Sequence, residues 1–523
     1  MRSLYAGMSL FFVCFTGVAK QPNIVFLFSD DHATQAIGAY GHELASLAPT
    51  PYLDRIADRG MRFDRCLVGN SICGPSRATI LTGTYSHINK FFSNEHTKFD
   101  GSQPTFPKVL QRNGYKTALI GKWHLASEPT GFDHWEILPG QGRYYNPDFR
   151  TADGVHREQG YVSELITGKA ITWLEEDRDA NQPFLLMVQH KAPHRDWSPA
   201  PKYLDAFSAV VFPEPETLFD TYENRSLAAK NQDMTLRNTM LLGSDLKVET
   251  YHTNRFARMS AEQKAAWKKV YDPINEAFEK AELEGEALVR WKYQRYLQDY
   301  LACIKSVDDS VGEIWDWLEA EGLLENTIFV YSSDQGFYLG EHGWFDKRFM
   351  YDESYRTPLL MSWPGITNPG SVCSNLVSNL DFAQTFLDAA GLEAPARMQG
   401  ASLLPLLRGD EEVSWRKSHY YHYYEYPGWH MVYRHEGAYD GRFKLIHYYD
   451  VDEWELIDMQ TDPHEMINQY GNPVYKKTVV RMHDELERLR ARYQVPPNKP
   501  KSVEGVTQHY HSDKIKVRQG DSE

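Results

Sequence analysis

Two pairs of residues with oxygen-bearing side chains come directly after apolar segments of the sequence. Asp30 and Asp31 follow the segment NIVFLFS, and Asp334 and Gln335 follow TIFVYSS. Adjacent carboxylates repel each other, so such a pair needs a nearby cation. Three carboxylates and one amide form a set of hard ligands that suits Ca²⁺ better than Mg²⁺, whereas Zn²⁺ prefers histidine or thiolate. Each pair alone is typical of a helix cap, but the two pairs together favour a metal site.

Cys73 has an unusual setting for a structural cysteine. It lies in the polar stretch SICGPSRATILTG, beside a Gly-Pro turn, an arginine and the start of a predicted helix. A buried thiol near the helix start is the alternative interpretation. Beyond the first nineteen residues the cysteines are too few for a disulfide framework, and whether one pair forms stays open. These cysteines are Cys66, Cys73, Cys303 and Cys373.

Four apolar segments that predict buried strands all end in polar clusters. Two are followed by the aspartate pairs, YKTALIG is followed by Lys122 and His124, and FLLMVQH is followed by His194. Segments with helical periodicity, 161–176 and 293–320, lie between them. Buried strands that alternate with helices predict an α/β fold, with a large mixed, mainly parallel sheet sandwiched by helices. Ligands of such sheets bind beyond the carboxyl ends of the strands, where these clusters lie.

Composition divides the chain into three predicted parts after its first nineteen residues. Residues 20–410 form the α/β domain, and within it the charged, Ala-rich stretch 214–290 predicts a helical insertion. Residues 411–496 contain short antiparallel strand patterns and an amphipathic helix, which predict a smaller α+β subdomain built on an antiparallel sheet. Residues 497–523 form a polar tail that we expect to be poorly ordered.

The net negative charge of the chain limits the classes of molecule that it can bind. The chain has 56 basic and 71 acidic residues and a formal net charge of −15. No broad cationic surface remains to neutralise phosphates, which excludes nucleic acid as a partner. An anionic substrate must therefore be held by local cations and not by the overall field.

The N-terminal segment predicts export. Residues 1–19 contain a basic residue, an apolar run and a small residue at Ala19, which is typical of a signal peptide. A lipoprotein anchor at Cys14 is disfavoured because Val13 is too bulky for the position before it. No other segment is long and apolar enough to predict a transmembrane anchor. We expect a periplasmic or secreted protein.

The stretch around Cys73 resembles the signature of the type I, formylglycine-dependent sulfatases of the alkaline-phosphatase-like superfamily. CGPSR followed by LTG agrees with that signature at every fixed position. The resemblance implies that a formylglycine-generating maturation enzyme oxidises Cys73 to Cα-formylglycine (3-oxoalanine), an aldehyde that works as its hydrate. It also implies the alkaline-phosphatase-like fold and the activity of a sulfuric ester hydrolase.

The same resemblance implies a metal site. Asp30 and Asp31 match the family's first pair of ligands, and Asp334 with Gln335 matches the second. Gln335 departs from the pattern, since asparagine or histidine often stands there, and its side chain is one methylene longer. Together with the modified Cys73, these four residues are the implied ligands of one Ca²⁺ per chain.

The motifs GKWH, APH and GWFDKRFMYDES match further catalytic positions of the family. A sulfate ester shields its sulfur with oxygens, so the site must gather positive charge to stabilise the attack. One hydroxyl of the hydrated aldehyde attacks sulfur in line, and His194 or Lys347 protonates the leaving alcohol. His124 then removes the proton whose loss expels the sulfate. The implied catalytic residues are Cys73, Arg77, Lys122, His124, His194 and Lys347.

Longer segments resemble bacterial N-acetylglucosamine-6-O-sulfatases that act on glycosaminoglycan or mucin-type glycans. These segments are SDDHATQA, GKWHLASEPTGFDHW, KAPHRDWSPAP, SSDQGFYLGEHGWFDKRFMYDES and YYHYYEYP. The resemblance implies a sulfated carbohydrate as substrate. We expect Asp346 and Arg348, which flank Lys347, and His422 to bind the sugar. The alternatives are a surface ion pair for the first two and a buried strand face for the tyrosine-rich segment.

Three other functions stay open from the sequence. One is a sulfatase that acts on another sulfated polysaccharide, such as an algal one. The second is a phosphonate or phosphate monoester hydrolase of the same superfamily. The third is a glycan-binding relative without activity, and the complete set of catalytic residues argues against it.

Overall fold

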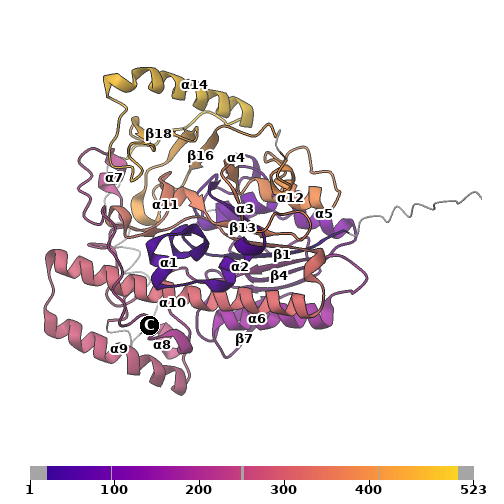
Figure 1. Ribbon diagram of the computed structural model, residues 1–523. Coiled ribbons are helices and arrows are strands. Elements are labelled where there is room, and N and C mark those ends of the chain that lie inside the picture. The colour runs from indigo at the N-terminus through magenta and orange to yellow at the C-terminus, as the bar shows by residue number, and fades with distance from the viewer. Residues whose placement is uncertain (1–20, 96, 249–252, 411–412, 504–523) are drawn as a thin grey trace, which may run out of the picture.

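The computed structural model describes residues 21–95, 97–248, 253–410 and 413–503 (Figure 1). The predicted signal peptide and most of the predicted polar tail lie outside the described residues. Among the described helices, none combines the length and the apolar composition that crossing a membrane would require.

A ten-stranded sheet forms the centre of the molecule and confirms the predicted fold class. The four apolar segments are central strands that run parallel, in the order β9, β1, β8 and β4, and β5 continues this parallel part. β13 runs antiparallel to β9, and β6 and β7 form an antiparallel edge. In sheet order the strands are β14 (Ser371–Cys373), β2 (Met61–Phe63), β13 (Leu359–Ser362), β9 (Thr327–Ser333), β1 (Asn23–Ser29), β8 (Phe184–Gln189), β4 (Lys116–Lys122), β5 (His134–Leu138), β6 (Asp148–Thr151) and β7 (Gly154–Arg157).

Each face of this sheet buries its own hydrophobic core. Because successive side chains of a strand point to opposite faces, Val25 and Leu27 of β1 belong to one core and Ile24 and Phe26 to the other. Helices α2, α6 and α10 cover the first face, and α3, α5 and α12 cover the second (Figure 1). Both faces are covered, which explains why the central strands are apolar throughout.

The helices include one that runs along the whole sheet and three short to medium ones in the predicted insertion. α10 has 36 residues and lies under the sheet beside α6 (Figure 1). α7, α8 and α9 fall within 214–290. The helices are α1 (Glu43–Leu47), α2 (Pro51–Arg59), α3 (Cys73–Thr82), α4 (Ser86–Asn89), α5 (Phe106–Arg112), α6 (Val162–Thr172), α7 (Leu227–Asn231), α8 (Asn254–Ala257), α9 (Ala261–Ala281), α10 (Gly285–Ala320), α11 (Asp352–Tyr355), α12 (Asp381–Ala389), α13 (Leu404–Leu407) and α14 (Lys476–Tyr493).

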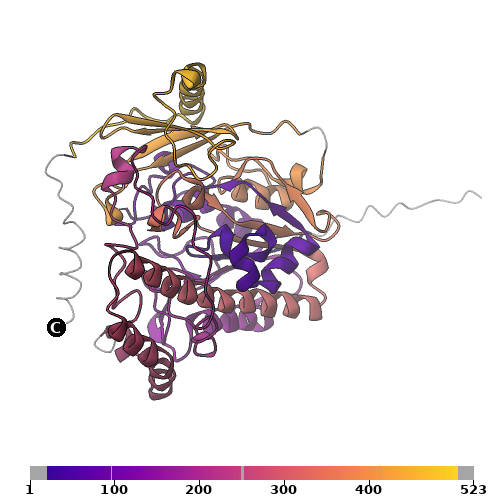
Figure 2. The same cartoon turned by 60° about the vertical axis from the view of Figure 1, so that its left-hand side comes forward.

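A four-stranded antiparallel sheet forms the C-terminal subdomain. Its strands are β16 (His419–Tyr423), β17 (His435–Tyr439), β18 (Phe443–Tyr448) and β19 (Glu453–Asp458). One face packs against α14, where Leu445 lies in a core with Leu486 (Figure 2). The other face packs on the α/β domain, where Ile446 shares a core with Phe349. This sheet therefore confirms the predicted antiparallel subdomain.

Two small sheets lie near the carboxyl ends of the central strands, among the residues that the structure describes. β10 pairs with β11 in an antiparallel hairpin, and β3 lies between β12 and β15. Their bounds are β3 (Cys66–Leu67), β10 (Tyr338–Leu339), β11 (Phe345–Asp346), β12 (Arg356–Thr357) and β15 (Val377–Ser378).

Candidate active site

The register of the central strands brings the two aspartate pairs together. Ser29 pairs with Ser333 at the carboxyl ends of β1 and β9. One ligand atom each of Asp30, Asp31 and Asp334 then lies within 4.8 Å of the others. The prediction that the two pairs meet at one edge of the sheet thus agrees with the strand register.

The oxygens of this cluster fit a cation. Gln335 donates from Nε2 to Oδ1 of Asp31, and all four side chains are buried. Oδ2 of Asp31 and Oε1 of Gln335 have no hydrogen-bond donor among the described residues, and the oxygens of Asp30 have only the ion pairs with Lys122 and Arg77. Buried acceptors of this kind require a partner, and a set of hard oxygen ligands suits a divalent ion such as Ca²⁺.

Arg77 links three strand ends beside these carboxylates. It lies in the second turn of α3, where its Nε and Nη2 donate to Oδ2 of Asp334 at 3.1 and 3.0 Å. Its Nη1 donates to the carbonyl of Lys122 at 2.7 Å and to Oε1 of Gln189 at 2.9 Å. The planar guanidinium serves these partners at once, which an ammonium group could not do. Arg77 is therefore held rigidly beside Asp30, 3.7 Å away.

Cys73 is the first residue of α3 and faces the same cluster. Its Sγ, a carboxylate oxygen of Asp30 and a ring nitrogen of His194 lie within 4.8 Å of one another. The side chain is 1% exposed, and burial raises the pKa of the thiol to about 12. An unmodified Cys73 would therefore stay protonated at neutral pH and would be a poor nucleophile.

Lys122 and His124 reach the cluster from the end of β4. The ammonium of Lys122 forms an ion pair with Asp30 and donates to Oε1 of Gln141. Burial, followed by the charge of Lys191, lowers the pKa of Lys122 well below its usual value. His124 has a left-handed backbone, with φ of 54°, and a buried Nδ1 without a hydrogen-bond partner among the described residues. Burial and the positive charge of Lys122 lower the pKa of His124, so its imidazole is neutral at pH 7.

His194 and Lys347 approach the cluster from the other side. Nδ1 of His194 contacts the carbonyl of Arg195 at 2.5 Å, and its Nε2 lies 3.8 Å from Oδ2 of Asp31. Lys347 donates from Nζ to Oδ1 of Asp31 at 2.6 Å. Burial alone would lower the pKa of Lys347, but the charges of Asp31 and Asp346 raise it above its usual value. The predicted catalytic residues therefore surround the carboxylate cluster.

The sequence profile of the sulfatase family matches residues 22–392, which is most of the chain. The chain belongs to the sulfatase family. A second profile, that of the N-sulphoglucosamine sulphohydrolase C-terminal region, matches residues 340–492 of this sulfatase. These matches confirm the predicted family and its activity class, the hydrolysis of sulfuric esters.

Individual relatives agree with this assignment. N-acetylglucosamine-6-O-sulfatase from Bacteroides thetaiotaomicron is 50% identical over 504 residues, covering 93% of this chain and 89% of that protein. Human N-acetylglucosamine-6-sulfatase is 29% identical over 424 residues, covering 76% of this chain and 66% of the human protein. A solved structure of a protein in complex with its substrate D-glucosamine-2-N,6-O-disulfate has a TM-score of 0.88 and 49% identity, covering 91% of this chain and 98% of that one.

Asp346 and Arg348 of this sulfatase form a buried group beside Lys347. Oδ1 of Asp346 lies 3.4 Å from Nη1 of Arg348, and its Oδ2 lies 3.2 Å from Nε2 of His430. Both are less than a tenth exposed, so they do not form the surface ion pair that was the alternative. Apart from this ion pair, Nη1 of Arg348 has no hydrogen-bond acceptor among the described residues, and the role of Asp346 and Arg348 in binding the sugar stays a prediction.

Among the described residues, the ring of His422 contacts side chains of the C-terminal subdomain. On β16 its Nδ1 contacts the hydroxyl of Tyr420 at 2.8 Å and its Nε2 contacts the hydroxyl of Tyr449 at 3.1 Å. Its ring stacks on Tyr424 with centroids 3.7 Å apart. Both ring nitrogens of His422 are therefore engaged inside the C-terminal subdomain, and its role in binding the sugar stays a prediction.

Sequence reasoning missed four residues that contact the site. Gln189 could have been found, because it is the polar last residue of an apolar strand. Lys191 also lies directly after that strand, and its Nζ donates to the Arg195 carbonyl at 3.2 Å. No sequence pattern marks Gln141, which lies in a loop, or His430, which lies in a 3-10 helix (Trp429–Met431), because the side chain that each contacts belongs to another segment.

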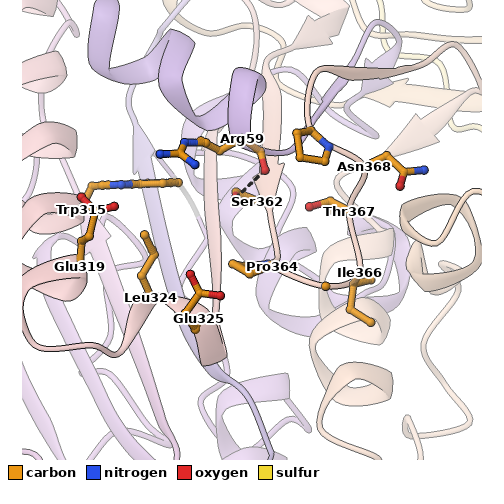
Figure 3. A pocket seen from close by; sticks show the side chains of 12 residues that line it. Arg59, Trp315, Glu319, Leu324, Glu325, Ser362, Pro364, Ile366, Thr367 and Asn368 are labelled. Carbon is orange, nitrogen blue, oxygen red and sulfur yellow. Dashed lines mark hydrogen bonds between the residues drawn. The ribbon is translucent and has the colours of Figure 1, made fainter.

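A pocket of about 390 Å³ (Figure 3) lies at the end of the central sheet that is opposite to the catalytic cluster. Its lining includes Leu324 and Glu325, which precede β9, and Ile366, which follows β13. Asp334 lies at the other end of β9, and seven residues of extended strand span roughly 20 Å. The pocket is therefore separate from the catalytic cluster.

Proposed function

We propose that this sulfatase removes the 6-O-sulfate from N-acetylglucosamine or glucosamine residues of glycosaminoglycan or mucin-type glycans. The observation that carries the proposal is the 50% identity to an N-acetylglucosamine-6-O-sulfatase over 93% of the chain. The solved structure in complex with D-glucosamine-2-N,6-O-disulfate, at 49% identity, supports the same class of substrate. A phosphonate monoester hydrolase that matches at 20% identity supports the fold alone.

The cluster fits one Ca²⁺ per chain and a modified Cys73. Asp30, Asp31, Asp334 and Gln335 would hold the ion, and the sulfur position of Cys73 lies beside them. The bound Ca²⁺ would offset the charge of the sulfate oxygens and lower the pKa of the nucleophile. Cα-formylglycine in place of Cys73 would supply, as its hydrate, the hydroxyl that attacks sulfur.

The charges of the chain itself prepare the site for an anion. Arg77, Lys122 and Lys347 balance the three carboxylates of the cluster. A divalent cation would add an excess of positive charge where the sulfate binds. In a buried site such charges stabilise the developing negative charge of the transition state more strongly than they would in water.

Three side chains, those of His194, Lys347 and His124, are placed to transfer protons. His194 presents Nε2 to the cluster because its Nδ1 is bound to a carbonyl. Together with the ammonium of Lys347, it is placed to deliver a proton to the leaving alcohol. Burial and the charge of Lys122 lower the pKa of His194, so it can donate from Nε2 only as the imidazolium, which a bound sulfate anion would favour. His124 would accept the proton whose loss releases the sulfate, and its low pKa keeps the imidazole available as a base.

Maturation and export complete the proposal. The predicted signal peptide supports a periplasmic or secreted protein. Because Cys73 is 1% exposed, a formylglycine-generating enzyme would have to act before the chain folds. Mass spectrometry of the peptide that contains Cys73 tests this step, since conversion of the thiol to the aldehyde lowers the mass by about 18 Da. Unmodified cysteine throughout a fully active preparation would contradict it.

The substrate is tested with defined sulfated sugars. Purified protein with Ca²⁺ is incubated with N-acetylglucosamine 6-sulfate, glucosamine 2,6-disulfate and the 4-epimer N-acetylgalactosamine 6-sulfate, and released sulfate is measured. We expect release from the two gluco-configured sugars and much less from the epimer. Inertness toward both of them, or a preference for phosphate esters of the same sugars, would contradict the proposed function.

A further inference from the structure

The loop that carries His194 is held from outside the central sheet. It follows β8 and reaches the catalytic cluster through a single ring, whose Nδ1 contacts the carbonyl of Arg195 at 2.5 Å. A carbonyl only accepts, so Nδ1 carries the proton and Nε2 is the atom presented to the reacting group. The direction of that ring therefore depends on where the Arg195 carbonyl lies.

Arg195 is fixed by a residue of the predicted helical insertion. Its Nε and Nη2 donate to the two oxygens of Asp245 at 2.7 and 2.6 Å, the parallel geometry of a bidentate pair. Asp245 is 1% exposed and also accepts from the backbone nitrogen of Leu241 at 2.8 Å. A buried carboxylate whose two oxygens both accept hydrogen bonds has one stable position. Because Arg195 donates to both oxygens, its side chain is fixed in one position as well.

The insertion holds the two following residues of the loop as well. Nζ of Lys247 donates to the carbonyl of Trp197 at 2.7 Å and lies 2.9 Å from Oδ2 of Asp299 on α10. Arg255 pairs with Asp196. Three consecutive loop residues, 195–197, therefore contact side chains of the predicted insertion 214–290. The sequence predicted this insertion only as a charged helical region.

We propose that Asp245 is a positioning residue that acts through Arg195 to aim Nε2 of His194 at the leaving oxygen of the ester. The inference rests on the proposed function, in which His194 is one of the two groups placed to protonate that oxygen. The insertion is then part of the catalytic apparatus, since it supplies the anchor for a loop that has no regular structure of its own.

Two substrates with different leaving groups can show whether Asp245 positions His194 or only stabilises the fold. The alcohol of a sugar sulfate needs a proton as it departs, whereas the nitrophenolate of 4-nitrophenyl sulfate does not. In Asp245→Asn and in the milder Arg195→Lys, we expect kcat/KM for N-acetylglucosamine 6-sulfate to fall roughly 10- to 100-fold, a typical share of proton-transfer catalysis. The value for 4-nitrophenyl sulfate should fall less than about threefold, and the double variant should lose no more than either single one.

A matched control comes from the C-terminal subdomain. Asp450 accepts a similar bidentate pair from Arg434, and its side chain is as buried as that of Asp245. Among the described residues its hydrogen bonds go to Arg434 and to the backbone of Lys501, not to the His194 loop. Asp450→Asn should leave both substrates unchanged while it lowers Tm. Equal losses on the two substrates in Asp245→Asn, or no loss, would overturn the role of Asp245. Failure of the unaltered protein to release sulfate from the sugar would instead contradict the proposed function.

Discussion

Lys347 donates a hydrogen bond from Nζ to Oδ1 of Asp31 at 2.6 Å, and Gln335 donates to the same oxygen. The second oxygen of Asp31 has no donor among the described residues. One half of the carboxylate is thus held by the protein, and the other half is left for a cation. This arrangement fixes the position of Asp31 through one oxygen while its other oxygen stays available for coordination.

Removal of the cation should destabilise the protein and abolish its activity. Without it, three buried carboxylates are balanced only by the neighbouring side-chain cations. We expect a chelator to lower Tm and to stop sulfate release, and Ca²⁺ to restore both better than Mg²⁺, which requires a stricter octahedral geometry. A ligand at 100 times its Kd adds about 2.7 kcal/mol to the free energy of unfolding. Differential scanning fluorimetry and an activity assay on the same samples measure the two effects.

The control for this prediction is Asp30→Asn, which removes one charge from the cluster. Its Tm should respond weakly to Ca²⁺, whereas that of Asp450→Asn, a variant remote from the cluster, should respond as the unaltered protein does. A Tm that is insensitive to chelator in the unaltered protein would contradict a cation at this site.

Arg77→Lys should be inactive although it keeps the charge. Arg77 bonds to Asp334, to the carbonyl of Lys122 and to Gln189 with three nitrogens. A single ammonium cannot reach all of these partners, so both the cation beside the sulfate and the Asp334 ligand would shift. We expect kcat/KM to fall at least about 100-fold, as on loss of one electrostatic contact to a transition state. Near-normal kinetics in this variant would show that charge alone is sufficient there.

Much of this site could be predicted because its residues follow strands at fixed distances. The pairs at Asp30 and Asp334 follow apolar strands directly, and the parallel register then puts them together. The motif around Cys73 marks the start of a helix, which the structure has at that residue. Local patterns of this kind are visible in a sequence.

Contacts between distant loops could not be predicted in this way. His430 contacts Asp346 from a short 3-10 helix 84 residues later, and Asp245 contacts Arg195 from an insertion 50 residues away. Each of these depends on how two irregular segments pack, and neither hydrophobic period nor spacing encodes that packing. The predicted role of His422 rested on its place in a tyrosine-rich strand, where the pattern does not tell which neighbours its ring meets.

Substitutions beside Lys347 and on β16 should separate sugar binding from packing. Arg348→Ala and Asp346→Asn should raise KM for N-acetylglucosamine 6-sulfate, with a combined loss in kcat/KM of roughly 10- to 100-fold, because they remove buried polar contacts offered to a sugar. His422→Ala should lower Tm with little change in KM, since its ring nitrogens bond to Tyr420 and Tyr449. The reverse result, a large KM effect for His422 alone, would place the sugar against β16.

Asp308 gives the fold a pH dependence away from the catalytic cluster. Its Oδ1 accepts from the backbone nitrogens of Tyr52 and Leu53 at the start of α2, at 3.1 and 2.8 Å. Burial raises the pKa of Asp308 to about 7 in the folded state, compared with about 3.9 for an exposed aspartate. Between these two values the folded protein holds a proton that the unfolded chain has released. The free energy of unfolding therefore falls as pH rises through this range, by up to about 1.4 kcal/mol per pH unit.

Asp308→Asn should remove this pH dependence without removing the cap of α2. The amide keeps an oxygen that can accept from Tyr52 and Leu53, but it carries no charge at any pH. The unaltered protein should lose roughly 2 to 3 kcal/mol of stability between pH 5 and pH 8 through Asp308, whereas the variant should not, so the advantage of the variant should grow by that amount over this range. Urea unfolding at the two pH values measures the difference. Asp316→Asn, in an exposed ion pair with Arg55, is the control and should change stability by less than about 1 kcal/mol. A destabilised Asp308→Asn at pH 8 would mean that the two backbone contacts depend on the charge of Asp308.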